Sequence, residues 1–130
     1  MTTKKAQLLI CDDAPAMRES LELILEQDYA LAFTTNGEEA VAHAKKNPVD
    51  LVILDIKMPR LNGIETLKTL RRMKPGIQVL VMTGYESSDV AAQAVKLGAA
   101  DYLVKPFERK KVIEQVEGIL RKCGKLKESV

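Results

Sequence analysis

Short apolar runs alternate with amphipathic segments along the chain. The runs hold four to six residues, and each ends at a polar or turn-forming residue. Runs of this length and composition are typical of strands buried on both faces of a parallel sheet. The predicted strands are residues 8–11, 31–35, 50–55, 77–82 and 101–104.

Between these runs, apolar residues recur at the spacing of a helix that buries one face. Met17, Leu21 and Leu25 show this spacing in the first such segment. Prolines, glycines and capping residues mark the ends of the segments. The five predicted helices begin near residue 15, near 38, at 63, after a serine cap at 87 or 88, and after 106. The fourth has a predicted buried stripe of Val90, Ala91, Ala94 and Val95.

Strands that alternate with helices through short connections predict an α/β fold with a parallel sheet. Right-handed crossovers place the helices on both faces of such a sheet. We therefore expect a three-layer sandwich, a flavodoxin-like doubly wound five-stranded parallel sheet with strand order 2-1-3-4-5. The predicted division is a domain over residues 1–124 and a short C-terminal tail over 125–130.

Composition narrows the function classes. A net charge of +2 over 130 residues does not favour binding to nucleic acid or to an anionic membrane. The apolar run after Lys4 and Lys5 is too short for a signal peptide, and no run approaches the ~20 residues of a membrane span. Cys11 falls in a predicted strand and Cys123 near the end of the last helix. A disulfide framework is therefore not expected, and the prediction is a cytoplasmic protein.

Three carboxylates follow two strands that the predicted order makes neighbours. Asp12 and Asp13 follow the first strand, and Asp55 ends the third. Adjacent strands lie ~4.8 Å apart, so the three would converge and repel one another without protons or a cation. Oxygen ligands favour Mg²⁺, or alternatively Mn²⁺. Taken alone, Asp13 would be a helix N-cap and Asp12 a solvated strand end.

Two more polar residues end the remaining strands at the same edge. Thr83 offers a hydroxyl donor and Lys105 a mobile positive charge suited to phosphate. A cis Lys105–Pro106 bond would aim the ammonium back over the pocket. Each residue alone would be structural or solvated, but with the acids they predict a site that handles a phosphoryl group.

Four segments of the chain resemble one family. They are residues 8–13 (LLICDD), 50–59 (DLVILDIKMP) with 62–63 (NG), 79–84 (VLVMTG) and 97–107 (LGAADYLVKPF). Together they resemble the response-regulator receiver domain of two-component signalling, over residues 7 to about 122. The resemblance is to chemotaxis-regulator-like chains that stand alone, or to a receiver excised from a longer regulator.

The resemblance implies roles for the strand-end residues. Asp55 would accept a phosphoryl group from the phosphohistidine of a sensor histidine kinase or a histidine phosphotransfer domain. Asp12, Asp13 and Asp55, with the backbone carbonyl of Lys57, would hold Mg²⁺. These assignments make the protein a phosphoacceptor rather than an enzyme, since its chemistry would be self-phosphorylation and slow self-dephosphorylation.

The resemblance also implies a switch. Thr83 and Lys105 would bind the phosphoryl oxygens, and Tyr102 matches the aromatic whose orientation is coupled to that threonine. The fourth helix, fifth strand and fifth helix would then present a changed surface to a downstream effector. The protein would be a monomer or a phosphorylation-dependent dimer. A separate hypothesis is that the bulk of Tyr85 hinders the hydrolytic water; otherwise its side chain simply faces solvent.

Two alternative classes remain open on the sequence. A metal-dependent phosphatase with an aspartyl intermediate usually carries a second acid two residues after the nucleophile, where this chain has Lys57. A pseudo-receiver would bind partners without being phosphorylated. Retention of the acids, Thr83 and Lys105 disfavours the pseudo-receiver.

Overall fold

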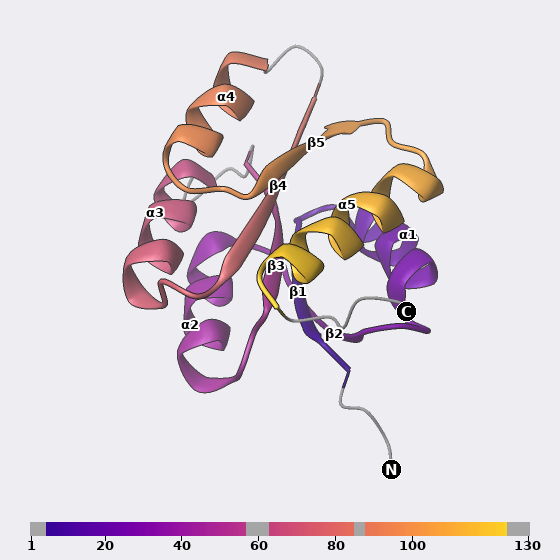
Figure 1. The fold of residues 1–130 in the computed structure, drawn as a ribbon, viewed down its shortest axis with the longest axis horizontal. Coiled ribbons are helices and arrows are strands. Elements are labelled where there is room, and N and C mark those ends of the chain that lie inside the picture. Colours follow the sequence, from indigo (N-terminus) through magenta and orange to yellow (C-terminus); the bar gives the residue numbers. More distant parts are fainter. Residues whose placement is uncertain (1–4, 57–62, 85–87, 125–130) are drawn as a thin grey trace.

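The protein forms a five-stranded parallel sheet with the strand order β2-β1-β3-β4-β5. The computed structural model describes residues 5–56, 63–84 and 88–124. Figure 1 shows the strands in the middle of the molecule, with helices on either side. The strand order is the predicted one. The strands are β1 (Gln7–Cys11), β2 (Ala30–Thr34), β3 (Leu51–Asp55), β4 (Gln78–Gly84) and β5 (Asp101–Lys105).

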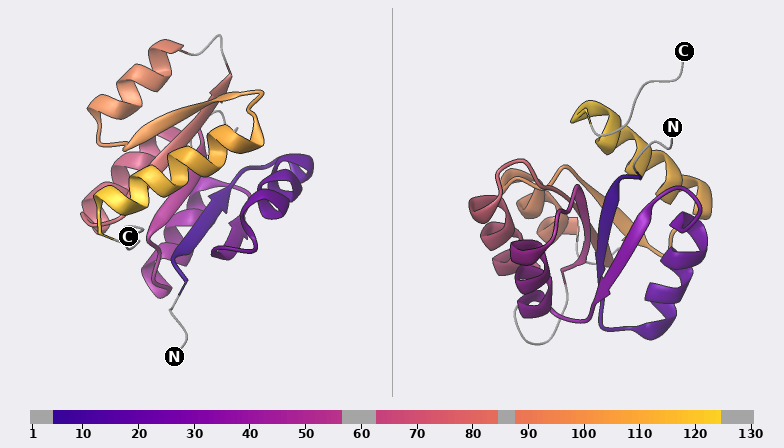
Figure 2. Two further views of the ribbon diagram at one scale, coloured as in Figure 1. Left: turned by 45° about the vertical axis from the view of Figure 1, so that its right-hand side comes forward. Right: turned by 90° about the horizontal axis from the view of Figure 1, so that it is seen from below.

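Helices cover both faces of the sheet, which makes the three layers that the sequence predicts. α1 and α5 lie together on one face, and α2, α3 and α4 lie on the other (Figure 2). The helices are α1 (Pro15–Leu25), α2 (Gly37–Lys46), α3 (Gly63–Met73), α4 (Ser88–Lys96) and α5 (Arg109–Lys122). No helix within the described ranges has the length and apolar character to cross a membrane.

The two cores follow from the alternation of side chains along each strand. In β1, Leu8 and Ile10 pack in the core under α1 and α5, while Leu9 and Cys11 pack in the core under α2 and α3. Every residue of β3 is buried. Full burial on both faces explains why β3 appears in the sequence as a continuous apolar run before Asp55.

Strand register brings the polar ends of neighbouring strands together. Cys11 pairs with Leu54, so Asp12 and Asp55 each come directly after a paired position. Asp55 pairs with Met82, and Thr83 pairs with Val104. The carboxyl ends of β1, β3, β4 and β5, which are neighbours in that order, therefore meet at one edge of the sheet.

The structure corrects several local expectations. β2 begins one residue earlier than predicted, because Ala30 pairs with Gln7, and it ends one residue earlier, because Thr35 N donates to the Glu39 carboxylate rather than to a neighbouring strand. Asp13 is not the cap of α1, since Ala14 occupies that position without a side-chain cap. Val95 is 43% exposed and does not belong to the buried stripe of α4, which consists of Ala91 and Ala94 with half-buried Val90. Ser87, one of the two predicted caps of that helix, lies outside the described residues.

Candidate functional site

Three carboxylates meet at the carboxyl edge of the sheet. Asp12 and Asp55 are buried, whereas Asp13 is exposed, and one oxygen of each lies within 4.8 Å of the others. Asp12 and Asp13 come from the loop after β1, and Asp55 comes from the end of β3. The structure thus brings together the three acids that the sequence predicts to converge.

Hydrogen bonds hold Asp12 on all sides. Its amide donates to Thr34 O at 3.1 Å, and its Oδ1 accepts from Ala14 N at 2.9 Å. Its Oδ2 lies 3.5 Å from Lys105 Nζ, and its backbone carbonyl accepts from Arg18 Nη1 at 2.7 Å. The carboxylate therefore has a fixed orientation relative to the sheet.

Lys105 reaches the same carboxylates from the edge strand. Its Nζ lies 3.2 Å from Asp55 Oδ2 and 3.5 Å from Asp12 Oδ2. The Lys105–Pro106 peptide bond is cis, one of the two isomers open to a residue that precedes proline. Among the described residues, the Lys105 ammonium thus contacts two of the three clustered carboxylates, and these four residues together carry excess negative charge.

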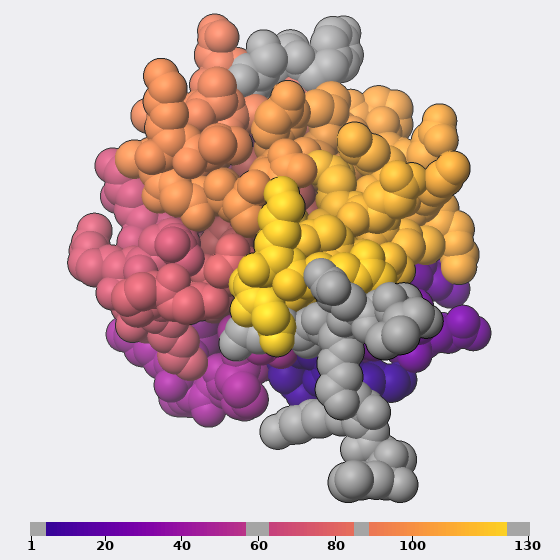
Figure 3. Space-filling view, viewed as in Figure 1, coloured from indigo at the N-terminus to yellow at the C-terminus, as the bar shows by residue number. Residues whose placement is uncertain are grey.

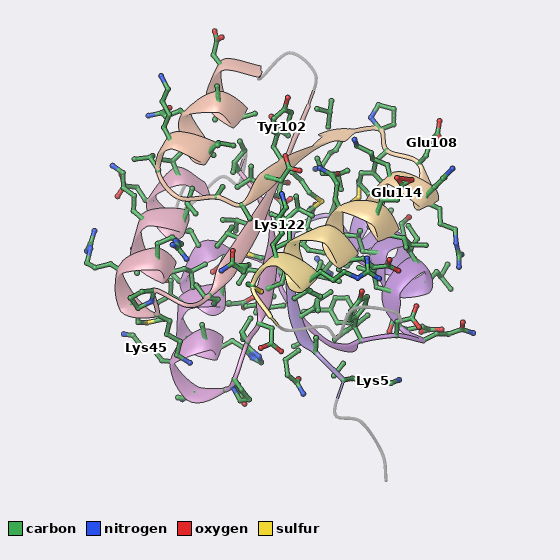
Figure 4. All side chains as sticks on the ribbon, in the orientation of Figure 1. Lys5, Lys45, Tyr102, Glu108, Glu114 and Lys122 are labelled. Carbon is green, nitrogen blue, oxygen red and sulfur yellow. The ribbon has the colours of Figure 1, made fainter. Side chains whose placement is uncertain are left out.

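Thr83 lies at the end of β4 and is 1% exposed. Its Oγ1 donates to the carbonyl of its neighbour Gly84 at 3.2 Å. Tyr102, which the resemblance couples to Thr83, is 42% exposed on β5 (Figure 4). Its backbone is fixed by Asp101 Oδ1, which accepts from Tyr102 N, and by Gln115 Nε2, which donates to Tyr102 O. Tyr102 thus occupies an outward position in this structure.

Burial and crowding set the electrostatics of the pocket. Burial raises the pKa of Asp12, and the nearby charge of Asp55 raises it further, while the bond from Ala14 N and the charge of Lys105 act in the opposite direction. Burial also raises the pKa of Cys11 to about 11. Cys11 is therefore a neutral thiol, which donates to Asn36 O at 3.2 Å and packs as a small hydrophobe, as expected from its place in the strand.

The donor set fits a hard divalent cation. Carboxylate oxygens are the ligands that Mg²⁺ prefers, and cations of this class usually keep part of their water shell. The exposure of Asp13 leaves one side of the cluster open to water. A cation there would relieve the repulsion that burial of Asp12 and Asp55 intensifies. Two predicted participants, Lys57 with its backbone carbonyl and Tyr85, lie outside the described residues.

Two residues near the site have roles that the sequence analysis missed. Arg18 bonds the carbonyl of Asp12, and its only sequence signal is its place on the first turns of α1. Gly63 lies against Ile56, the residue after Asp55: a Cβ at position 63 would overlap the Ile56 backbone and lie 2.8 Å from its Cβ. A glycine is needed there for α3 to begin so close to the end of β3.

A family model described as the response regulator receiver domain matches residues 8–117. The chemotaxis protein CheY of Thermotoga maritima is 36% identical over 115 residues, which cover 87% of this chain and 96% of that protein. The transcriptional regulatory protein ZraR of Klebsiella oxytoca is 38% identical over 109 residues, or 83% of this chain. That match covers only 25% of ZraR, so this chain spans about a quarter of the length of such relatives.

Solved structures share the fold over nearly the whole chain. A CheY-like response regulator receiver domain protein from Methanospirillum hungatei superposes with a TM-score of 0.88 at 28% identity. The superposition covers 94% of this chain and 98% of that one. The strand order, the acid cluster and these matches agree, and the chain belongs to the response regulator receiver domain family of two-component systems.

Proposed function

We propose that this chain is a phosphoacceptor in two-component signal transduction and that Asp55 receives the phosphoryl group. The observation that carries the proposal is the position of Asp55 Oδ2, 3.2 Å from Lys105 Nζ and inside a cluster of three carboxylates. An acceptor oxygen needs a cationic environment when a phosphoryl dianion approaches, because phosphoryl transfer depends mainly on charge neutralisation and alignment.

The reaction that we propose transfers the group from a phosphohistidine. A carboxylate oxygen of Asp55 forms a bond to phosphorus as the phosphorus–nitrogen bond of the donor breaks. The electron pair of that bond stays on the imidazole nitrogen, which takes up a proton. The product is an acyl phosphate on Asp55, later hydrolysed by water. Each protein molecule thus takes up one phosphoryl group as the acceptor and is regenerated by hydrolysis, and we do not class it as an enzyme.

The residues around Asp55 have separate tasks in this proposal. Asp12, Asp13 and Asp55, together with the carbonyl of Lys57, would hold Mg²⁺. When bound, this ion offsets negative charge on the phosphoryl oxygens. Lys105 would exchange its contact with Asp55 Oδ2 for a phosphoryl oxygen, since its flexible stem allows a short movement.

The switch in this proposal begins at Thr83. Its hydroxyl now donates to Gly84 O and would instead donate to a phosphoryl oxygen, an acceptor that carries more charge. Movement of the segment after β4 would let Tyr102 leave its outward position. We treat this as a population shift with a coupling free energy of ~1–3 kcal/mol.

The surface that would change is continuous in the structure. Figure 3 shows atoms of α4, β5 and α5 side by side on the front of the molecule. Val95, Tyr102 and Val104 are exposed apolar residues of α4 and β5. We propose that this surface binds a downstream effector or a second copy after phosphorylation. The phosphodonor would be a sensor histidine kinase or a histidine phosphotransfer domain in the cytoplasm.

Intact mass spectrometry tests the chemistry directly. We expect the wild-type protein to gain one phosphoryl group after incubation with acetyl phosphate and Mg²⁺. Asp55→Asn should gain none, whereas Asp28→Asn, a change at an exposed aspartate before β2, should behave as the wild type. A phosphoryl gain that persists in Asp55→Asn would contradict the assignment of the acceptor.

A further inference from the structure

Arg18 touches the acid cluster without belonging to it. It lies on α1, is half-buried, and its Nη1 donates to the backbone carbonyl of Asp12 at 2.7 Å. The other contacts of Asp12 come from the adjacent strand end, the start of α1 and Lys105. Arg18 therefore adds a separate hydrogen bond, from a positively charged side chain, to Asp12.

The charge of Arg18 also acts on Glu39, a residue in the first turn of α2. The carboxylate of Glu39 accepts hydrogen bonds from Thr35 N at 2.7 Å and from Thr35 Oγ1 at 2.8 Å. These bonds are the main reason that the pKa of Glu39 is lowered, and the charge of Arg18 adds to the effect. Arg18 thus joins α1 to the residue that follows β1, and its charge acts on Glu39.

The position of Arg18 affects the loop that carries the carboxylate oxygens of Asp12 and Asp13. Asp12 and Asp13 sit on a short loop between β1 and α1, and the loop must keep two mutually repelling carboxylates on one side. A charge-assisted bond to the Asp12 carbonyl holds that loop at its first peptide unit. Without Arg18, the carbonyl would lose a partner, and the remaining bonds of Asp12 would hold the two repelling carboxylates less firmly at their present spacing.

We propose that Arg18 is a positioning residue for the divalent-cation site: its bond to the Asp12 carbonyl holds the oxygens of Asp12 and Asp13 at the spacing that binds Mg²⁺. The inference rests on the proposed function, because it assumes that the acid cluster binds the cation. Residues that orient metal ligands typically contribute 10–100-fold in affinity although they never touch the metal.

A matched control separates positioning from general stability. Arg71 is also half-buried and also donates from Nη1 to backbone carbonyls, those of Pro75 at 2.7 Å and Ile77 at 2.5 Å. It lies near the end of α3, at the opposite end of the sheet from the acids. Arg71→Ala removes a comparable arginine without touching the loop after β1.

The test is a calorimetric titration of metal-free protein with MgCl₂, at a temperature where circular dichroism shows each variant to be folded. We expect Arg18→Ala to raise the dissociation constant for Mg²⁺ about tenfold. Arg71→Ala should stay within about twofold of the wild type even if it unfolds at a lower temperature. If Arg18→Ala does not fold, Arg18→Asn is judged against the same expectation, because its amide is too short to reach the carbonyl.

Asp13→Asn completes the experiment by removing one ligand. If it binds Mg²⁺ weakly while Arg18→Ala binds as the wild type does, the positioning role of Arg18 is wrong and the cation site stands. If the wild type does not bind Mg²⁺, or Asp13→Asn binds it equally well, the cation site in the proposed function is wrong and the inference falls with it.

Discussion

The two ends of the sheet treat their carboxylates in opposite ways. At the amino ends of the strands, Asp50 Oδ2 accepts from Gln7 N at 2.7 Å. Asp101 there accepts from Tyr102 N and from Gln115 Nε2. At the carboxyl ends, Asp12 and Asp55 lie beside each other and share one lysine. The acids at the amino ends form hydrogen bonds with neighbouring strands and a helix. The acids at the carboxyl ends lie close together and repel one another.

The same contrast holds between the charged residues at the two ends of β3 and at the two ends of β5. Asp50 and Asp55 bracket β3, and Asp101 and Lys105 bound β5. Asp50, just before β3, and Asp101, the first residue of β5, accept hydrogen bonds within the fold, while Asp55 and Lys105 at the strand ends lie in the shared pocket. Charged side chains elsewhere, such as Lys45, Glu108 and Lys122, lie on the surface of the helices or at their starts (Figure 4).

The largest effect is expected at Lys105, the cation of the carboxyl end. Lys105→Met keeps the length of the side chain but removes the charge that faces Asp55. We expect the rate of phosphoryl uptake from acetyl phosphate to fall on the order of 100-fold, as when other preorganised electrostatic contacts are lost. Quench-flow sampling with mass detection measures this rate. Lys122→Met on α5 serves as the control, and an equal loss in both variants would refute a specific role for Lys105.

Asp50, at the amino end, should affect stability and not chemistry. Asp50→Ala leaves Gln7 N without its carboxylate partner, so we expect the free energy of unfolding to fall by about 1.5–3 kcal/mol. Urea denaturation measures the change, and Asp28→Ala is the exposed control. Phosphoryl uptake at Asp55 should stay unchanged. A variant of normal stability that no longer takes up phosphate would reverse the contrast between the two ends.

The smallest expected effect is a change in the pH dependence of stability. Burial raises the pKa of Asp12 above its ordinary value of 3.8, so the folded state favours the protonated carboxyl. Its contribution to stability is present below pH 3.8 and is lost as pH rises through the raised value. Without Mg²⁺, Asp12→Asn should therefore gain stability relative to the wild type as pH increases from about 4 to 7.

Glu39 should change the pH dependence of stability in the direction opposite to Asp12. Hydrogen bonds from Thr35 lower its pKa from 4.5, so its contribution is present above pH 4.5 and is lost as the pH falls. Relative to the wild type, Glu39→Gln should be less stable near neutral pH, and the difference should shrink in acid. Urea unfolding at several pH values compares both variants, and slopes of the same sign would contradict this account.

Strand order and the meeting of the acids followed from sequence for a simple reason. Buried strands appear as continuous apolar runs, and parallel strands place their final residues at one edge, so Asp12, Asp55, Thr83 and Lys105 were grouped by topology alone. These features depend on the pattern of a whole strand rather than on a single contact.

The missed features depend on individual contacts. The bond from Arg18 to the Asp12 carbonyl joins a side chain to a backbone group, which leaves no pattern in the sequence. The close approach of Gly63 to Ile56 arises only when α3 packs on β3. Val95 has the apolar character of a core residue but faces outward, because Ala91 and Ala94 already fill the space under α4. Periodicity indicates a face, and tertiary packing decides how wide that face is.

Lys105 and the carboxylates that it contacts lie far apart along the chain, so they are synthesised at different times. The lysine extends from the outermost strand, past β4, to carboxylates on β3 and β1. During synthesis, Asp55, the proposed acceptor, therefore leaves the ribosome well before Lys105. A chain interrupted ahead of residue 105 would carry Asp55 without the ammonium beside it. Under the proposed function, phosphoryl uptake at Asp55 would therefore require the last strand to be complete.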